Sequence, residues 1–489
     1  MSQSATPLFS GLLAHTEQNP VQFHIPGHKK GKGIDPDFRE FIGDNALSID
    51  LINIGPLDDL HQPKGIIKEA QDLAAEAFGA DQTFFSVQGT SGAIMTMVMA
   101  VCGPGEKIIV PRNVHKSVMS AIIFSGATPI FIHPVVDREL GISHGITTDA
   151  VSKALEQHPD AKGLLVINPT YFGISADLKQ IVDIAHSYNV PVLVDEAHGV
   201  HIHFHDELPM SAMQAGADLS ATSVHKLGGS MTQSSILNLK GNLVSPKRVQ
   251  TILSMLTTTS TSYLLLASLD VARKRLATEG KALLEETITL SNYIRSELNN
   301  IEHIHCIGKE ILGSKATFDY DPTKLIICVK DLGLNGFDVE IWLREHYHIE
   351  VEMSDLYNIL CIITPGDTKA EADILIQALK QLSAERHGKA AKVEAQVLLP
   401  NIPLLALSPR DAFYADSELV PFDESEGRII AEFIMVYPPG IPIFTPGEII
   451  TKENLQYIKT NMEAGLPVQG PEDYDFKFLR VIKEHKAIK

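Results

Sequence analysis

The sequence is poor in cysteine and in basic residues, and each shortage excludes a class of protein. Only 4 of its 489 residues are cysteines. They are scattered singly, without a Cys-x-x-Cys pair, which excludes a dense disulfide framework and is typical of a reducing compartment. The 41 Lys and Arg residues stand against 60 Asp and Glu residues, a formal net charge of −19. This acidic balance argues against nucleic-acid binding as the main function, because that task usually needs a basic face.

Long hydrophobic runs are also missing. Residues 82–105 carry no charge, but the apolar part of this stretch is only Ala93–Cys102, which is too short to span a bilayer. The N-terminal residues 1–20 have no basic flank followed by an apolar stretch, so no secretion signal is expected. We therefore predict a cytoplasmic protein that has neither a membrane nor a nucleic acid as its partner.

The spacing of the apolar segments predicts the fold class. Short apolar runs alternate with helical stretches from Gly65 to about Leu239, which indicates an α/β fold with a mainly parallel sheet covered by helices. Strands are expected at residues 107–110, 129–132, 163–167, 191–194, 324–329 and 359–363, and one long helix over 264–300. The domains expected are an irregular arm (1–64), a large domain (65–310), a small α+β domain (311–384) and a C-terminal domain (385–489).

The segment Gln88-Gly-Thr-Ser-Gly92 is the first candidate for ligand binding. It lies between a strand expected at residues 83–87 and a helix expected to begin near Ala93. Small residues let the backbone approach an anion, and a helix N-terminus offers free N–H groups and a positive dipole end, so the segment resembles a phosphate cradle. A plain helix cap is an equal alternative. The known dinucleotide and P-loop motifs are absent, which disfavours ligands bound by them.

Two charged residues follow. Asp195 ends the apolar run Val192–Val194, and ligands of open α/β sheets lie beyond the carboxyl ends of strands. The alternative is a capping or turn aspartate. Lys226 lies in Ser223-Val-His-Lys226, before two glycines. An imine-forming lysine needs desolvation or a cationic neighbour such as a cofactor pyridinium. Taken alone, Lys226 is more simply a solvated surface lysine.

Together these segments suit one cofactor. A phosphate cradle, an aspartate at a strand end and a later Ser-x-His-Lys segment are the parts that pyridoxal 5'-phosphate requires, because the protein anchors the phosphate, keeps the ring nitrogen protonated and holds the aldehyde as an imine. On these residues the chain resembles the fold-type I Orn/Lys/Arg decarboxylases. From about Pro7 to the C-terminus it is similar to the short biosynthetic arginine decarboxylases of Gram-positive bacteria.

The resemblance implies roles for individual residues. The large domain binds pyridoxal 5'-phosphate, Lys226 forms the imine and Asp195 pairs with the pyridine nitrogen. His115 stacks on the cofactor ring and His198 lies beside it. Lys226 and His198 are both candidates for the donor that protonates Cα. The phosphate ligands implied are Thr90, Ser91, Ser223 and His225.

Two further matches concern the partner subunit and the substrate. Thr258 matches a threonine that reaches the phosphate of the partner subunit, which implies an obligate homodimer. Glu448 ends the loop Pro438–Glu448 and matches a glutamate that faces the distal cationic group of the substrate. A carboxylate suits a guanidinium in that role. Asp58 and Asp59 are further candidates for substrate contact. The wing domain of the larger relatives has no counterpart here, so assemblies built through it are not expected.

The function implied is decarboxylation of L-arginine to agmatine and CO₂, feeding polyamine (putrescine and spermidine) synthesis. Lysine or ornithine decarboxylation is an alternative, because composition does not discriminate among the three substrates. A fold-type I aminotransferase or lyase, with Arg410 or Arg428 on the substrate carboxylate, and a non-catalytic cofactor-binding regulator are the others. No metal is expected. If residues 201–205 formed a strand, His201, His203 and His205 would share a face, but no cysteine or paired carboxylate completes a ligand set.

Overall fold

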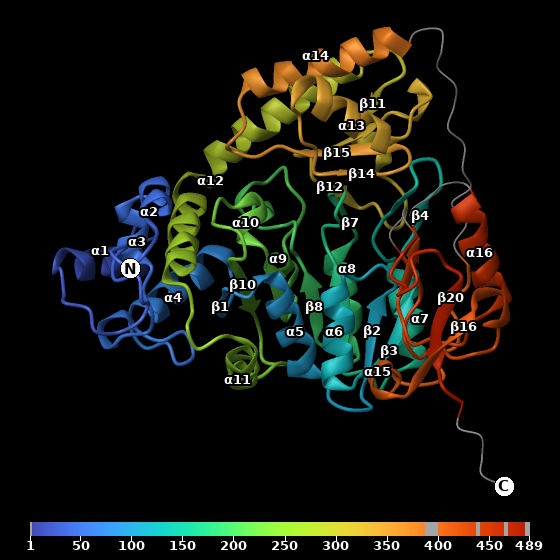
Figure 1. The fold of residues 1–489 in the computed structure, drawn as a ribbon, viewed down its shortest axis with the longest axis horizontal. Helices are drawn as coiled ribbons and strands as arrows, with labels where there is room; N and C mark the ends of the chain where they lie inside the picture. Colours follow the sequence, from blue (N-terminus) through green and yellow to red (C-terminus); the bar gives the residue numbers. More distant parts are fainter. Residues whose placement is uncertain (1, 387–399, 437–440, 464–467, 485–489) are drawn as a thin grey trace. The chain divides into compact units, whose positions relative to one another are not determined.

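The computed structural model describes residues 2–386, 400–436, 441–463 and 468–484 (Figure 1). The chain divides into two compact units. Unit 1 comprises Met1–Val101 and Asn189–Leu284, and unit 2 comprises Cys102–Tyr188 and Glu285–Lys489. Among the described helices, none is long and apolar enough to cross a membrane.

Unit 1 is built on strands whose residues are buried on both faces. β8 (Val192–Asp195) and β9 (Leu219–Thr222) run parallel, and every residue of both is buried. β10 (Ser235–Leu239) pairs antiparallel with β9 and with β1 (Gln82–Ser86). Burial of every residue along a strand is expected where helices cover both faces of a sheet. The helices of unit 1 are α1 (Pro7–Glu17), α2 (Pro36–Ile42), α3 (Asp44–Ile49), η1 (Gly55–Leu57), α4 (Ile66–Phe78), α5 (Gly89–Val101), η2 (Ile202–Phe204), α9 (Ala212–Ala215), α10 (Val224–Leu227), α11 (Pro246–Leu256) and the part of α12 (Tyr263–Leu298) that ends at Leu284.

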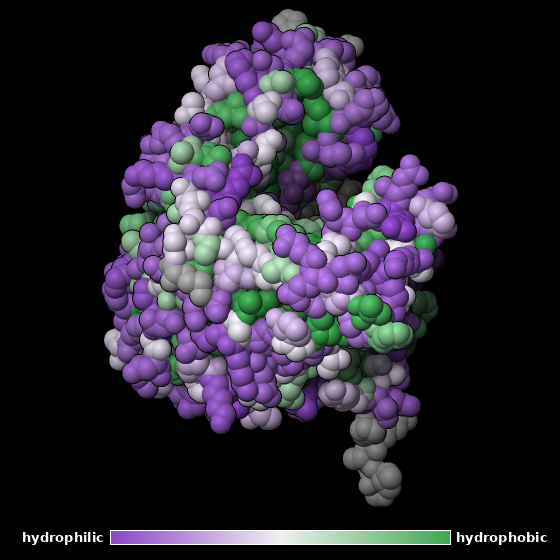
Figure 2. Space-filling view, turned by 90° about the vertical axis from the view of Figure 1, so that its left-hand side faces the viewer, coloured by the Kyte–Doolittle hydropathy of each residue, from purple (hydrophilic) through white to green (hydrophobic). Residues whose placement is uncertain are grey.

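The N-terminal arm is more regular than the sequence suggested. Proline at the first helical position starts both α1 and α2, where its missing N–H costs nothing. The arm nevertheless exposes large apolar side chains, including Phe23 at 95% and Phe41 at 85%. The side of the molecule on which α1–α3 lie shows hydrophobic surface between hydrophilic side chains (Figure 2). Because α1, α2 and α3 are regular helices, the prediction of an irregular arm was wrong for these parts.

Unit 2 begins with three parallel strands. β2 (Lys107–Pro111) lies between β3 (Thr128–Ile132) and β6 (Gly163–Ile167). Helices α6 (Lys116–Ser125), α7 (Thr148–Gln157) and α8 (Leu178–Ser187) connect or follow these strands, together with the short strands β4 (Val136–Asp137), β5 (Ile142–Ser143) and β7 (Ile174–Ser175).

The middle part of unit 2 is a four-stranded antiparallel sheet with helices on it. The order is β11-β13-β15-β14. Its core joins the strands to α13, to α14 and to the end of the long helix α12 (Figure 1). The bounds are α12 (Tyr263–Leu298), β11 (His305–Cys306), η3 (Lys309–Ile311), β12 (Asp319–Tyr320), β13 (Lys324–Cys328), η4 (Lys330–Leu332), α13 (Gly336–Tyr347), β14 (Met353–Ser354), β15 (Asn358–Ile362) and α14 (Lys369–Arg386).

The C-terminal part of unit 2 has a separate apolar core around Ile430, Phe444 and Leu479. Two small antiparallel sheets, β16-β20 and β18-β17-β19, surround this core. The bounds are α15 (Pro409–Tyr414), β16 (Ser417–Pro421), η5 (Phe422–Glu424), β17 (Ile434–Val436), β18 (Ile441–Phe444), α16 (Lys452–Glu463), β19 (Val468–Gln469) and β20 (Phe478–Ile482). Residues 438–440 of the predicted substrate loop lie outside the described residues.

The α/β prediction is confirmed, and two local predictions are corrected. Each predicted strand and the long helix appear within two residues of the expected bounds. The helix expected near Ala93 begins earlier, because Gly89 has a φ of +69° and turns the chain into α5 directly after β1. The strand considered for residues 201–205 was wrong, since Ile202–Phe204 form one 3₁₀ turn.

Candidate functional site

A cluster of hydroxyl groups lies at the N-terminus of α5 in unit 1. Thr90, in the first turn, hydrogen-bonds through its hydroxyl to Ser223, and its Oγ1 lies 2.7 Å from the Ser235 Oγ. All three side chains are buried. The Gly89 N–H donates to the carbonyl of Gln233, which fixes the turn before the helix. Ser91, half-buried, lies in the same turn. The predicted cradle therefore sits where the helix dipole favours an anion.

Asp195 lies at the carboxyl end of β8 and is 5% exposed. Its Oδ1 accepts one hydrogen bond, from the Ala197 N–H at 3.2 Å. Desolvation raises the pKa of Asp195 to about 6, although this N–H and the charge of Lys226 act to lower it. A further cation beside Asp195 would offset this desolvation and favour the charged form of the carboxylate.

Lys226 and His198 meet in the same unit. Lys226 lies on α10, whose N-cap is the buried Ser223, and His198 follows β8 by three residues. The Lys226 Nζ is 2.8 Å from the His198 Nε2. Neighbouring His225 is fixed by a contact of 2.8 Å between its Nδ1 and the Ser234 carbonyl oxygen. Lys226 itself is an exposed residue, while His198 is buried.

Glu196, beside Asp195, was not singled out from the sequence. Its buried carboxylate accepts the Ala212 N–H at 2.6 Å and the Thr222 hydroxyl at 3.3 Å. Burial raises the pKa of Glu196 to about 8, against the effect of these donors. The side chain therefore joins the end of β8 to α9 and β9.

Thr258 lies in the loop after α11 and is exposed. Its hydroxyl accepts the Ser260 N–H at 3.3 Å, and its carbonyl oxygen lies 3.0 Å from His61 Nε2. The other nitrogen of His61 is 2.7 Å from the Ser254 hydroxyl. His61 therefore holds this loop, a role that the sequence analysis missed.

The Asp58 carboxylate accepts hydrogen bonds from the backbone. The donors are N–H groups at the start of α4, among them Gly65 at 2.8 Å and Ile67 at 3.0 Å. Although burial acts to raise the pKa, these backbone donors hold the pKa of Asp58 below its usual value. The substrate role considered for Asp58 is not supported, because its oxygens cap a helix.

In unit 2, Glu448 pairs with Arg112, and His115 lies three positions after Arg112 in the sequence. His115 is the N-cap of α6: its Nδ1 accepts the Ser117 N–H at 3.2 Å, and its side chain is exposed. Glu448 is 0% exposed and forms a bidentate ion pair with Arg112 at 2.5 and 2.8 Å. A substrate guanidinium at Glu448 would have to replace or share Arg112. The substrate role of Glu448 stays a prediction.

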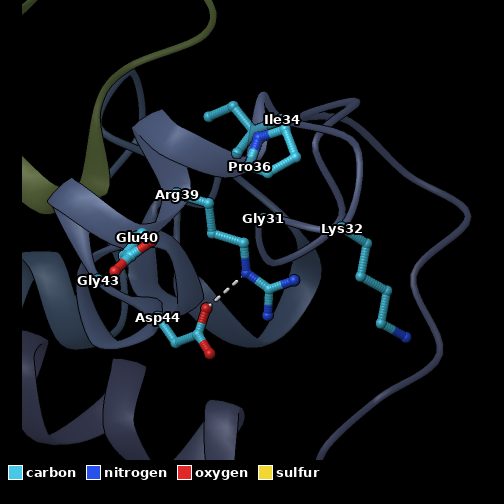
Figure 3. Close-up of a pocket in the computed structure, with 8 residues that line it drawn as sticks. All are labelled: Gly31, Lys32, Ile34, Pro36, Arg39, Glu40, Gly43 and Asp44. Carbon is cyan, nitrogen blue, oxygen red and sulfur yellow. Dashed lines mark hydrogen bonds and ion pairs between the residues drawn. The ribbon is translucent and has the colours of Figure 1, made fainter.

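A pocket of about 400 Å³ in the arm is separate from these residues. Its lining comes from residues 31–44, and within it Arg39 points toward Asp44, with Nε 2.7 Å from Oδ1 (Figure 3). No predicted site residue lines it. Among the described residues, no group of three or more His, Cys, Asp and Glu side chains is arranged to hold a metal.

The comparisons with known proteins agree with one another. A family model described as the Orn/Lys/Arg decarboxylase major domain matches residues 6–371, and the C-terminal domain model of the same family matches residues 393–470. An arginine decarboxylase of Bacillus anthracis is 73% identical over 489 residues, covering 100% of this chain and 99% of that protein. One of Bacillus subtilis (strain 168) is also 73% identical over 489 residues, covering 100% of both. A Francisella novicida lysine decarboxylase structure gives a TM-score of 0.84 at 25% identity, covering 98% of this chain and 81% of that one.

Proposed function

Because the chain belongs to the Orn/Lys/Arg decarboxylase family, we propose that it is a pyridoxal 5'-phosphate-dependent carboxy-lyase that converts L-arginine to agmatine and CO₂. The observation that carries the proposal is the 2.8 Å contact between Lys226 Nζ and His198 Nε2, in the unit that also holds the buried Asp195. The relatives at 73% identity that are named arginine decarboxylase favour arginine over lysine and ornithine.

The residues of unit 1 fit the cofactor. The Thr90, Ser223 and Ser235 hydroxyls gather at a helix N-terminus, where a phosphate is favoured. Asp195 is a desolvated carboxylate with a raised pKa, and a pyridinium N–H would provide the cation and the hydrogen bond that restore its charged form. When bound, pyridoxal phosphate supplies a ring that accepts the electron pair left on Cα as CO₂ departs.

The chain's own residues provide the remaining chemistry. Lys226 Nζ would hold the cofactor covalently and give way to the substrate amine. His198, in contact with Nζ, would pass or hold the proton that Cα needs, and either residue suits as the final donor. His115 would stack on the cofactor ring. Ser91 and His225 would complete the phosphate ligands.

The amino-transfer alternative finds no support from its candidate arginines. Arg428 donates to Glu418 Oε1 at 2.7 Å and to the Ile482 carbonyl at 3.0 Å. Arg410 donates to the Phe124 carbonyl at 3.2 Å. Both guanidinium groups thus tie parts of unit 2 together.

We also propose a homodimer with shared sites, placed in the cytoplasm and feeding polyamine synthesis. The exposed Thr258 hydroxyl supports a role toward a partner subunit's phosphate. Exposed arm side chains such as Phe23 and Phe41 supply apolar surface of the kind that subunit contacts bury.

The test is product analysis with purified protein and added pyridoxal phosphate. CO₂ release from arginine, lysine and ornithine would be measured side by side, and agmatine is the expected product. A preference for lysine would overturn the substrate assignment, and a keto acid product would overturn the reaction. Lys226→Ala should abolish the visible absorbance of the bound cofactor and the turnover. Lys247→Ala, an exposed lysine on α11, is the control that keeps both.

A further inference from the structure

The buried ion pair between Arg112 and Glu448 joins two distant parts of unit 2. Arg112 follows β2 directly, and Glu448 lies just after β18. Both side chains are essentially inaccessible, at 1% and 0% exposure. Removing one partner of such a pair leaves an uncompensated buried charge, and a buried ion pair adds little stability by itself. A role other than stability is therefore considered for this pair.

The Arg112 guanidinium uses each of its three nitrogens. Nη1 donates to Glu448 Oε1 at 2.5 Å, and Nη2 donates to Oε2 at 2.8 Å and to the Ile443 carbonyl at 3.2 Å. Nε donates to the Pro442 carbonyl at 2.9 Å. The Arg112 Cζ also lies 4.6 Å from the centroid of the Phe131 ring. The planar, five-donor geometry of arginine is needed for this arrangement, which lysine cannot reproduce.

The Glu448 carboxylate accepts hydrogen bonds from its own loop as well as from Arg112. Its Oε2 also accepts the Thr445 N–H at 2.7 Å, so the carboxylate fixes its own loop as well as Arg112. On the other side, the Arg112 backbone N–H donates to the Ile132 carbonyl at 2.8 Å. Both the backbone and the side chain of Arg112 are therefore fixed by hydrogen bonds.

Two residues separate Arg112 from His115, the histidine that the proposed function places on the cofactor ring. Val114, between them, is buried, whereas His115 is exposed. The His115 Nδ1 accepts the Ser117 N–H, so in the neutral ring the proton lies on Nε2. A shift of the chain at Arg112 would carry this exposed ring with it, because only two residues lie between.

We propose that Arg112 and Glu448 are positioning residues for His115: the pair anchors the segment after β2 to β18 and the turn Thr445–Glu448 that follows it, and so fixes the position of the His115 ring. This inference rests on the proposed function, since it concerns the ring that meets the cofactor. It differs from the substrate role predicted for Glu448, which requires a carboxylate open to the substrate.

Variants of the pair and of His115 separate the two roles. Glu448→Gln should lower kcat about a hundredfold, as expected when a reacting group is misplaced. His115→Ala should also lower kcat, and the variant that carries both substitutions should have the same kcat as His115→Ala alone. Arg112→Met/Glu448→Met, which replaces the pair by apolar side chains, should recover part of the activity that Arg112→Met loses. Glu418→Gln, which alters the half-exposed pair with Arg428 in the same unit, is the matched control and should leave activity unchanged.

The opposite pattern would overturn the inference. If Glu448 binds substrate, Glu448→Gln raises KM for arginine, its effect adds to that of His115→Ala, and the double Met variant recovers nothing. A readout without cofactor keeps the test independent of the proposed function. Amide hydrogen exchange of the cofactor-free protein should quicken at residues 112–117 in Glu448→Gln, but not in Glu418→Gln. Unchanged exchange there would reject the positioning role, whereas absent turnover in the wild type with altered exchange would reject only the proposed function.

Discussion

Asp195 and Glu448 are both buried carboxylates, one in each unit, yet their surroundings differ. Glu448 is saturated by the Arg112 guanidinium and by the Thr445 N–H. Asp195 accepts one backbone N–H, and desolvation raises its pKa to about 6. A carboxylate that the fold has already paired holds the structure together. One that the fold has desolvated without a full partner is ready for a cation supplied by a ligand.

The largest effect expected from this contrast is that of Asp195→Asn. The amide cannot keep a ring nitrogen protonated, so activity should fall about a thousandfold, equivalent to about 4 kcal/mol of transition-state stabilisation. Steady-state decarboxylation with saturating cofactor measures it. Asp218→Asn is the control, because buried Asp218 accepts the Val192 N–H at 2.8 Å at the opposite end of β8. It should retain activity with reduced stability. Near-normal turnover by Asp195→Asn would contradict the ligand role.

A smaller effect is expected at the hydroxyl cluster. Thr90→Val removes the hydroxyl that meets Ser223 and Ser235, so the cofactor dissociation constant should rise about tenfold, the value of roughly one hydrogen bond. At saturating cofactor, kcat should change little. Thr96→Val is the matched control on the same helix, because the Thr96 hydroxyl donates to the Gly92 carbonyl at 2.8 Å. Equal cofactor affinity of the two variants, measured by equilibrium dialysis, would remove Thr90 from the phosphate ligands.

Local signals explain what was predictable from the sequence. The end of an apolar strand marked Asp195, a glycine turn before a helix marked Thr90, and two following glycines marked Lys226. Each depends on a few neighbouring residues, and the same holds for the strands and for the long helix α12. The resemblance then assigned roles that these patterns alone left open.

The missed residues depend on distant parts of the chain. Ser235 contacts Thr90 only because β10 pairs with β1, although the two residues are 145 positions apart in the sequence. Arg112 and Glu448 are separated by 336 residues, so no local pattern links them. His61 holds the Thr258 loop across 197 residues. Such partners follow from tertiary packing, which single-residue patterns do not encode.

Glu196 affects stability and not turnover, and it tests the comparison because the groups that donate hydrogen bonds to its carboxylate are neutral. Burial raises the pKa of Glu196 to about 8, whereas in the unfolded chain the value is about 4.5. The folded protein therefore binds the extra proton between these values. The stability that this proton confers is complete below about pH 4.5 and is lost as pH rises through about 8. The slope contributed is at most about 1.4 kcal/mol per pH unit.

Glu196→Gln removes this proton exchange while its amide oxygen still accepts the Ala212 N–H. Urea unfolding of the cofactor-free protein at several pH values from about 5 to 8 should show a steeper loss of stability for the wild type than for Glu196→Gln. Asp195 changes stability in the same direction and is present in both proteins, and because its charge contributes to the raised pKa of Glu196, the difference between the curves reports Glu196 together with this coupling. Parallel curves would mean that Glu196 is ionised in the folded protein. A buried carboxylate would then need no cation to stay charged here, and the contrast between Asp195 and Glu448 would lose its physical basis.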